Sequence, residues 1–392
     1  MQIESIWLIL APILLSFLFT NKNNSIWSMI GLGITFGSIV IAITSSDLIT
    51  FSICIVAAVL SWPVLKLIHL NATDKAQRNT LEGTTKHLFH NFLASTIFSL
   101  GIALILLNSD SLSISAITQT LNQQSISPSS LLGAIATVAS ALALIGMIPF
   151  HLYSADTAEA ANENGHLPLT INFTIAFLIM YKLFPWGCLW QKVNLHNAIT
   201  TLLILSVFLG PMIACVQARI IRLLTWLVLG EVSFVFLLMI QFRPIGYHDS
   251  MNAGILMLFS SMAGLGIFFQ ICNKIGIFSK PAPVLADITG LWKKSNIQVI
   301  IAIYALVWLC NLPGSPGWLG KWSLLKTMIN QTDYWLIISF GSIPIQILNI
   351  HYVFKYMRTG QEPSINSLKI NSIIIIMMLA TTSIFYFSNH LI

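Results

Sequence analysis

Residues 297–330 read IQVIIAIYALVWLCNLPGSPGWLGKWSLLKTMIN, an apolar run of 34 residues that prolines and glycines interrupt at 313–317. A straight α-helix of that length would measure about 50 Å, whereas the hydrocarbon core of a membrane is about 30 Å thick. Proline and glycine break helices, and the backbone groups left unpaired are tolerated inside a membrane only where they face protein or a water-filled cavity. The stretch therefore predicts a single membrane span that is discontinuous at 313–317.

The rest of the chain has the same apolar character. Of its 392 residues, 56% are hydrophobic and 8% are charged, and the mean hydropathy is +0.82. A soluble domain is about one quarter charged, and a disordered chain combines low hydrophobicity with many charges, so the composition excludes both classes. The apolar runs also lack the alternation with polar residues that barrel strands show. We predict an all-α, polytopic transmembrane helix bundle.

Runs of about 20 apolar residues, which a membrane span needs, recur from one end of the chain to the other. The first run lacks a basic leader and a small-residue cleavage site, so we expect a span there and not a signal peptide. The predicted spans are 4–20, 26–45, 48–69, 87–107, 130–152, 167–190, 197–215, 219–241, 251–273, 297–330, 334–357 and 370–389.

Basic residues gather in alternate loops, which fixes the predicted orientation. With the N-terminus outside, the basic loops all face the inside, as the positive-inside rule requires, provided that 297–330 crosses once. The net charge of +6 therefore reports topology, and we predict no nucleic-acid binding. The five scattered cysteines predict no disulfide framework and no metal site. The inside loops carry Lys75, Arg78, Lys86, Arg219, Arg222, Lys274, Lys280, Lys293, Lys294, Lys355, Arg358 and Lys369, against little more than Lys192, Arg243 and Lys326 outside.

A second interruption occurs at Ile148-Pro149-Phe150-His151, followed by Asp156, Glu159 and Glu163 before apolar sequence resumes at Leu167. The two interruptions lie about 165 residues apart, and each is followed by a lysine in apolar surroundings. Paired interruptions of this kind are typical of transporters that are built from two related halves and bind ions where their helices are broken. The pattern therefore favours a transport function.

Three ionisable residues lie inside predicted spans, namely Lys182, Glu231 and Lys321. Each costs about 2.5–3.5 kcal/mol at the centre of a span, so such residues usually have a partner or a function. Burial disfavours the charged form of a lysine and a nearby carboxylate favours it, so that moving the partner can switch the protonation state. The three residues are candidates for a proton relay. The alternative for the two lysines is that they extend from span ends to the membrane interface.

Four further residues are weaker candidates. His151 follows the proline of an interruption, where it can relay protons near neutral pH or hydrogen-bond an unwound carbonyl. Lys66 lies near the end of its span and is expected to extend to the interface. His87 and His90 share a helix face near a loop, and we expect them to be interfacial and to ligate no metal.

Six stretches resemble, in the same order, the antiporter-like membrane subunits of respiratory complex I. The resemblance is strongest to the subunit N type of NADH-quinone oxidoreductase, which mitochondria encode as NADH dehydrogenase subunit 2, and it runs from about residue 45 to 330. The stretches are Ser61-Trp62-Pro63, Glu82-Gly83-Thr84-Thr85-Lys86-His87-Leu88-Phe89, Ile148-Pro149-Phe150-His151-Leu152-Tyr153-Ser154-Ala155-Asp156, Arg222-Leu223-Leu224, Asp287-Ile288-Thr289-Gly290-Leu291 and Leu312-Pro313-Gly314-Ser315-Pro316-Gly317-Trp318-Leu319-Gly320-Lys321.

The resemblance implies two inverted five-helix repeats with a discontinuous helix in each, and a row of buried lysines across the middle of the membrane. On that pattern Lys182 matches the central lysine and Lys321 the lysine of the second half, while Glu231 stands in the segment where the family commonly has a histidine. The implied regions are a first half at 45–190, a second half at 191–335 and C-terminal helices at 336–392.

The chain also departs from the family pattern. Ala58 stands where the family has an intramembrane glutamate, and Leu144 where it has the lysine that precedes the Pro-Phe-His block. The glutamate–lysine pair of the first half is therefore missing. An insertion around 158–165 lengthens the first interruption.

These observations predict a multi-pass membrane subunit of complex I that contributes to proton translocation coupled to ubiquinone reduction through Lys182, Glu231, Lys321 and His151. The resemblance implies other membrane subunits of the complex and lipids as partners, in a mitochondrial inner or bacterial plasma membrane. No ligand set for a flavin, iron–sulfur cluster, haem or metal is evident, so we expect no cofactor and no catalytic redox site in this chain. Two alternatives remain: a non-pumping scaffold of that complex, or a subunit of a cation/proton or inorganic-carbon transport complex.

Overall fold

The computed structural model describes residues 26–69, 75–109, 111–123, 127–161, 164–183, 195–241, 247–278, 282–329 and 340–359. The predicted spans 4–20 and 370–389 lie outside these residues. The helices are α2 (Ile26–Thr44), α3 (Leu48–His69), α4 (Lys75–Leu106), α5 (Ile114–Gln123), α6 (Pro128–Ile145), α7 (Leu152–Ala161), α8 (His166–Leu183), α10 (Leu195–Cys215), α11 (Ile220–Gln241), α12 (Tyr247–Lys274), η4 (Leu285–Ile288), α13 (Leu291–Lys294), α14 (Asn296–Leu309), α15 (Pro316–Ile329) and α17 (Ser342–Arg358).

Eight of these helices are long and apolar enough to cross a membrane: α2, α3, α4, α6, α8, α10, α11 and α12. The all-α, multi-pass prediction is confirmed. α4 begins at Lys75, well before the predicted start at 87, because its first turns are polar and continue the helix beyond the apolar run.

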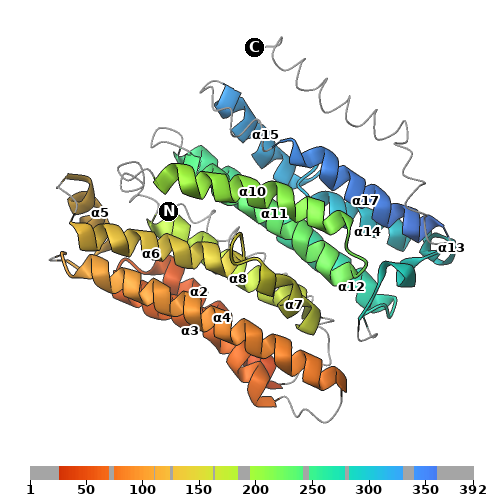
Figure 1. The fold of residues 1–392 in the computed structure, drawn as a ribbon, viewed down its shortest axis with the longest axis horizontal. Helices are drawn as coiled ribbons and strands as arrows, with labels where there is room; N and C mark the ends of the chain where they lie inside the picture. Colours follow the sequence, from red (N-terminus) through yellow and green to blue (C-terminus); the bar gives the residue numbers. More distant parts are fainter. Residues whose placement is uncertain are drawn as a thin grey trace.

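The first interruption divides one span into α6 and α7, which both pack along α4 (Figure 1). Gly101 of α4 approaches Gly133 of α6, and further along α4 a Cβ at Gly83 would lie 2.0 Å from the Cβ of Ala160 on α7. α6 ends at Gly146, whose left-handed backbone (φ 71°) lets its N–H cap the last carbonyls of the helix. α6 and α7 therefore form one discontinuous span, antiparallel to α4.

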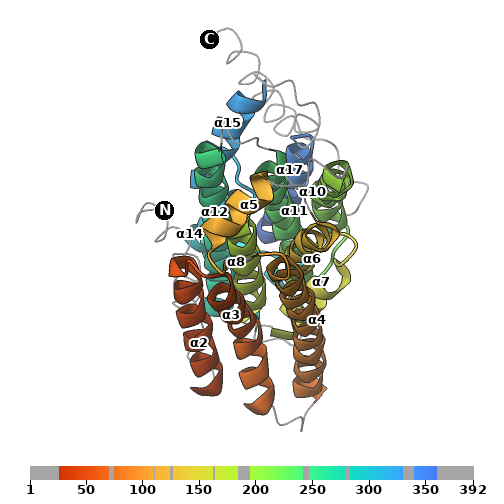
Figure 2. The ribbon, with the colours of Figure 1, turned by 90° about the vertical axis from the view of Figure 1, so that its left-hand side faces the viewer.

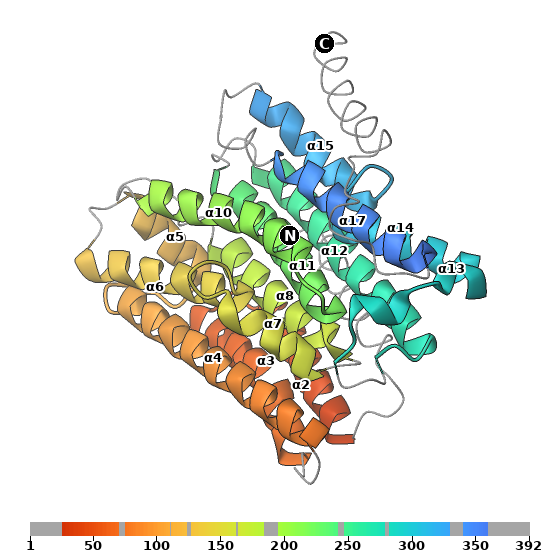
Figure 3. The same ribbon diagram turned by 45° about the vertical axis from the view of Figure 1, so that its right-hand side comes forward.

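The second interruption divides the 297–330 run in the same way. α14 and α15 follow one another along α12 (Figure 3). Gly264 of α12 lies against Ala305 and Leu309 at the end of α14, and Gly320 of α15 lies against Ala253 near the start of α12. The prediction of a single discontinuous span is confirmed.

The helices pack in two groups with the same order of contacts. In the first, α2 packs against α3, α3 against α4, and α4 against α6 and α7; Figure 2 shows α2, α3 and α4 side by side. In the second, α10 packs against α11, α11 against α12, and α12 against α14 and α15. Because five spans separate each helix from its counterpart, counterparts run in opposite directions, as inverted repeats do. The boundaries 45–190, 191–335 and 336–392 stay a prediction.

The described ends of the helices that border the basic loops lie at one end of the bundle, where α4 and α11 begin and where α7, α12 and α17 end. Connections at this end include the hydrogen bonds from Ile220 N to Pro283 O and from Gly290 N to Tyr356 O. We call it the basic end; the positive-inside rule predicts that it faces the inside.

α8 and α11 lie at the centre of the bundle and are almost entirely buried. The surrounding helices expose large apolar side chains outward, among them Ile53, Phe89, Leu100 and Ile300. Such a surface suits lipid or neighbouring membrane subunits. The central position of α11 places Glu231 deep in the protein.

Candidate functional site

Glu231 and Lys321 form an ion pair in the interior of the second group of helices. The Lys321 Nζ lies 2.7 Å from Glu231 Oε1, and each side chain is 1% exposed. Glu231 lies three turns into α11, and Lys321 lies on α15 just beyond the interruption. The expectation that these two residues are buried charges is confirmed, and the alternative that Lys321 extends to the interface is wrong.

The interruption supplies further partners for the pair. Lys321 Nζ also donates to Cys310 O (2.9 Å), a carbonyl left free because α14 ends at Leu309. Glu231 accepts from Asn311 Nδ2 (2.7 Å) and from Gln346 Nε2 of α17 (2.5 Å). Each charged group is therefore hydrogen-bonded beyond the ion pair itself, as a buried pair requires.

The backbone at the interruption has the shape that this site needs. Asn311 is fully buried and adopts a left-handed conformation (φ 49°), which asparagine tolerates better than most residues. A Cβ at Gly317 would lie 1.7 Å from Asn311 Oδ1, so only glycine fits there. Asn311 Nδ2 also donates to Ser261 Oγ on α12 (2.8 Å). Asn311, Gln346 and Ser261 were missed from the sequence; the nearest signal was that Asn311 precedes the proline–glycine cluster.

His151 lies at the first interruption, beside α11. It is half-buried, its ring centroid is 5.7 Å from that of Trp226, and its Nδ1 is buried without a hydrogen-bond partner among the described residues. Trp226 precedes Glu231 by about one turn of α11. His151 is thus near the element that carries the carboxylate, and its part in a relay stays a prediction.

Lys182 lies apart from this pair. It occupies the last turn of α8, is half-buried, and donates from Nζ to Ser45 O (2.8 Å) at the turn between α2 and α3. This turn is at the end of the bundle opposite the basic end. Lys182 thus lies one residue before the end of α8, away from the Glu231–Lys321 pair, and its part in a proton relay stays a prediction.

We expect Lys182→Met to affect stability more than transport. The substitution removes one hydrogen bond from a charged donor to the α2–α3 turn, a loss of about 1–2 kcal/mol. A small drop in the unfolding temperature of the assembled protein, with proton movement close to normal, is the expected outcome. A large fall in proton movement would instead place Lys182 in the pathway.

The first group of helices has no such ion pair at the positions where the resemblance predicts one. Ala58 is fully buried and Leu144 is 2% exposed. His87 is 2% exposed, so the expectation that it is interfacial is wrong; it faces the α3 and α4 interior because it packs against Trp62. The Nζ of Lys66 lies 4.8 Å from the centroid of the Trp62 ring, which corrects the expectation that it extends to the interface.

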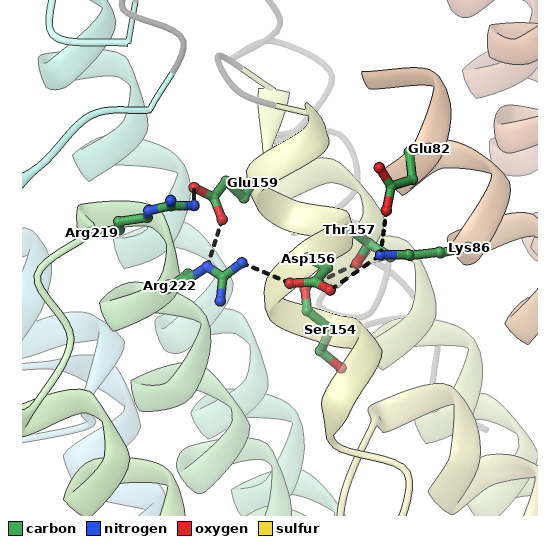
Figure 4. Close-up of polar contacts among 8 residues, drawn as sticks. All are labelled: Glu82, Lys86, Ser154, Asp156, Thr157, Glu159, Arg219 and Arg222. Carbon is green, nitrogen blue, oxygen red and sulfur yellow. Dashed lines mark hydrogen bonds and ion pairs between the residues drawn. The ribbon is translucent and has the colours of Figure 1, made fainter. Parts of the chain in front are cut away.

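Six charged residues form a cluster at the basic end, which we call the charged cluster (Figure 4). Arg222 of α11 donates to Glu159 Oε2 (2.5 Å) and to Asp156 Oδ1 (2.8 Å) on α7, and Arg219 also pairs with Glu159. On the other side, Lys86 of α4 pairs with Glu82 (2.7 Å) and lies 3.6 Å from Asp156.

The charged cluster joins the two groups of helices through α7. Its members line a polar pocket of about 270 Å³ between α4, α7 and α11. Only the acidic residues after the first interruption were noted from the sequence; their basic partners were assigned to loops. The arginines and their acidic partners are 60 to 66 positions apart in the sequence, so no local sequence pattern indicates that they pair.

The fold and the buried pair define an antiporter-like membrane subunit: a helix bundle with two discontinuous spans and a carboxylate–ammonium pair at one of them. The chain belongs to the family described as "NADH:quinone oxidoreductase/Mrp antiporter, TM", whose model matches residues 45–346. The resemblance to the antiporter-like subunits is confirmed at this level.

Relatives by sequence are bacterial proteins named NADH-quinone oxidoreductase subunit N. The protein from Moorella thermoacetica is 25% identical over 338 residues, which cover 84% of this chain and 67% of the relative. The protein from Buchnera aphidicola is 23% identical over 370 residues, covering 91% and 73%. With 65% of the Desulforamulus reducens protein covered, the chain spans about two thirds of the length of the curated relatives it matches.

Similar solved structures are subunits of multi-subunit membrane complexes. Respiratory complex I from Thermus thermophilus matches with a TM-score of 0.69 at 16% identity, over 92% of this chain and 78% of the other. The Mrp complex from Dietzia matches with 0.72 at 12% identity, over 92% and 67%. An archaeal membrane-bound sulfane sulfur reductase matches with 0.72 at 13% identity, over 98% and 78%. At these identities the likeness shows the fold.

Proposed function

We propose that this chain is a membrane-arm subunit of a proton-translocating NADH-quinone oxidoreductase, complex I, and contributes to proton movement coupled to quinone reduction. The observation that carries the proposal is the buried Glu231–Lys321 pair at the second interruption. The names of the sequence relatives support complex I over other assemblies.

The pair suits reversible proton transfer because the charge of each partner depends on the other. A carboxylate and an amine can each hold and release a proton, and Glu231 Oε1 lies 2.7 Å from Lys321 Nζ, within reach of direct transfer. Asn311 and Gln346 both donate to Glu231, so they can hold the carboxylate while the lysine is neutral. The proton leaves Lys321 Nζ on one side and is replaced from the other.

The charged cluster and His151 give this site a route towards the basic end. Arg222, Trp226 and Glu231 follow one another along α11, with Arg222 in the water-accessible charged cluster and Trp226 against His151. Histidine changes protonation near neutral pH. We propose that His151 passes protons between this end and Glu231.

Electron transfer to quinone takes place in other subunits on this proposal, and the chain acts through proton movement alone. The exposed apolar faces of the outer helices fit other membrane subunits and lipids, within a hetero-oligomeric complex.

The likeness to the Mrp complex favours a second candidate, exchange of a monovalent cation for protons. The missing pair at Ala58 and Leu144 favours a third, a scaffold that keeps the fold without pumping.

Purification of the chain with its natural partners tests the proposal. We expect quinone-reductase subunits to co-purify, and reconstituted vesicles to acidify or alkalinise their lumen when quinone is reduced. Partners of another kind, together with proton movement that depends on sodium or potassium gradients, would support the antiporter candidate. Quinone-reductase partners with proton movement that is insensitive to Glu231→Gln would support the scaffold.

A further inference from the structure

The place of the missing ion pair in the first group of helices is filled by uncharged hydrogen bonds. Pro63 lacks the N–H that would bond to the carbonyl of Val59 in α3, so this carbonyl, next to Ala58, needs another donor. Asn91 Nδ2 of α4 donates to Val59 O (3.0 Å). Asn91 is fully buried, so the contact lies deep in the protein.

From Asn91 the hydrogen bonds continue to Leu144, the second position where the resemblance predicts a charged residue. Asn91 and Asn172 of α8 exchange two amide hydrogen bonds, of 3.0 and 3.3 Å. Asn172 Nδ2 donates to Tyr153 Oη of α7 (3.4 Å), and Tyr153 Oη donates to Leu144 O at the end of α6 (2.8 Å). These hydrogen bonds thus connect the Val59 carbonyl of α3, next to Ala58, with the Leu144 carbonyl of α6. We call Asn91, Asn172 and Tyr153 the amide chain.

The chemistry of the amide chain differs from that of Glu231 and Lys321. A carboxylate and an amine take up and release protons, whereas an amide donates and accepts hydrogen bonds without changing its charge. The amide chain therefore has no group that stores a proton between its two asparagines. The amides of Asn91 and Asn172 and the hydroxyl of Tyr153 all have protein partners, so the amide chain is continuous without a bridging water.

Lys66 lies near the Asn91 end of the amide chain, separated from it by two aromatic rings. The Nζ of Lys66 lies over the Trp62 ring, and that ring lies 5.9 Å from the ring of His87, whose Nε2 is 3.2 Å from Asn91 Nδ2. In its protonated form Lys66 would repel a proton that enters from this side, as cations do in pores that exclude protons.

We propose that the amide chain is a plug that closes the first group of helices to protons, so that protons pass this subunit only through the Glu231–Lys321 site. Proton passage at the Glu231–Lys321 site rests on the proposed function, whereas the plug itself is tested by passive proton permeability.

Asn91→Ala in the full complex tests the plug. The substitution removes the donor to Val59 O and leaves the Asn172 amide with Tyr153 as its remaining partner, beside a new cavity that draws in water. In sealed vesicles with an imposed pH gradient and no quinone turnover, we expect a several-fold faster proton leak than for the unmodified complex. Ser95→Ala is the matched control: Ser95 lies one turn along α4 and its hydroxyl bonds only to Asn91 O. It should leave the leak unchanged.

Two further measurements keep the proposal falsifiable. Asn172→Ala leaves Val59 O paired with Asn91 and should raise the leak as well. Hydroxyl-radical footprinting of the unmodified complex should leave His87 unmodified if the region is dry. An unchanged leak in assembled Asn91→Ala and Asn172→Ala complexes, or modification of His87, overturns the plug. A lower proton-to-quinone ratio with an unchanged leak would make the amide chain part of the path. Because the leak is read without turnover, a failure of the proposed function does not affect this result.

Discussion

Replacing Lys321 by methionine is expected to lower the yield and thermal stability of the assembled complex more than any other substitution considered. Methionine keeps most of the volume of lysine but removes the ammonium group, which leaves the Glu231 carboxylate without its cation at a site that is 1% exposed. Breaking a buried ion pair by removing one partner costs about 3–5 kcal/mol. Detergent-solubilised complex should therefore unfold at a clearly lower temperature.

The double variant Lys321→Met with Glu231→Gln is the control for this prediction. Glutamine preserves the shape of glutamate, its oxygen can accept from Asn311 or Gln346, and its NH2 can donate to the unpartnered oxygen of the other once that amide turns. No charge is left unpaired. We expect the double variant to recover much of the lost stability. If Lys321→Met alone is as stable as the unmodified complex, the two charges are not coupled as described.

Arg222→Gln is expected to have the second-largest effect, by loosening α7 from α11. Arg222 bonds to Asp156 and Glu159 at once, and Glu159 is only 13% exposed. Because the arginine and Asp156 are about one-third exposed, solvent screens part of the interaction, and the expected loss of stability is about 1–2 kcal/mol. Residues 152–161 should exchange amide hydrogens faster than in the unmodified complex, and proton movement per quinone should fall.

Lys86→Gln provides the comparison. Lys86 is 48% exposed and lies 3.6 Å from Asp156, so its loss should change exchange in α7 far less. Equal effects of the two variants, or none from Arg222→Gln, would show that the charged cluster does not hold α7 in place.

The broken helices could be predicted from sequence because proline and glycine act locally. The runs around Pro149 and around Pro313 to Gly317 are each too long or too interrupted for one regular helix, and both predictions are confirmed. Burial of Glu231 was predictable for a similar reason, because no other charged residue lies within two helical turns of it in the sequence.

The partners of these residues could not be predicted, because they come from distant parts of the chain. Lys321 is 90 positions from Glu231, and Gln346 is 115 positions away. Lys182 donates to Ser45 O, a partner 137 positions away. The burial of His87 depends on contacts with Trp62 and Asn91, and the contact with Trp62 appears only when α3 and α4 are packed together.

The ratio of protons moved to quinones reduced, measured in sealed vesicles for the unmodified complex and for Glu231→Gln, tests the central claim most directly. Glutamine keeps the shape of glutamate and one acceptor oxygen for Lys321, but it cannot exchange a proton with Lys321. A lower ratio with quinone reduction still proceeding is the predicted result. An unchanged ratio would contradict a role for the pair in proton movement.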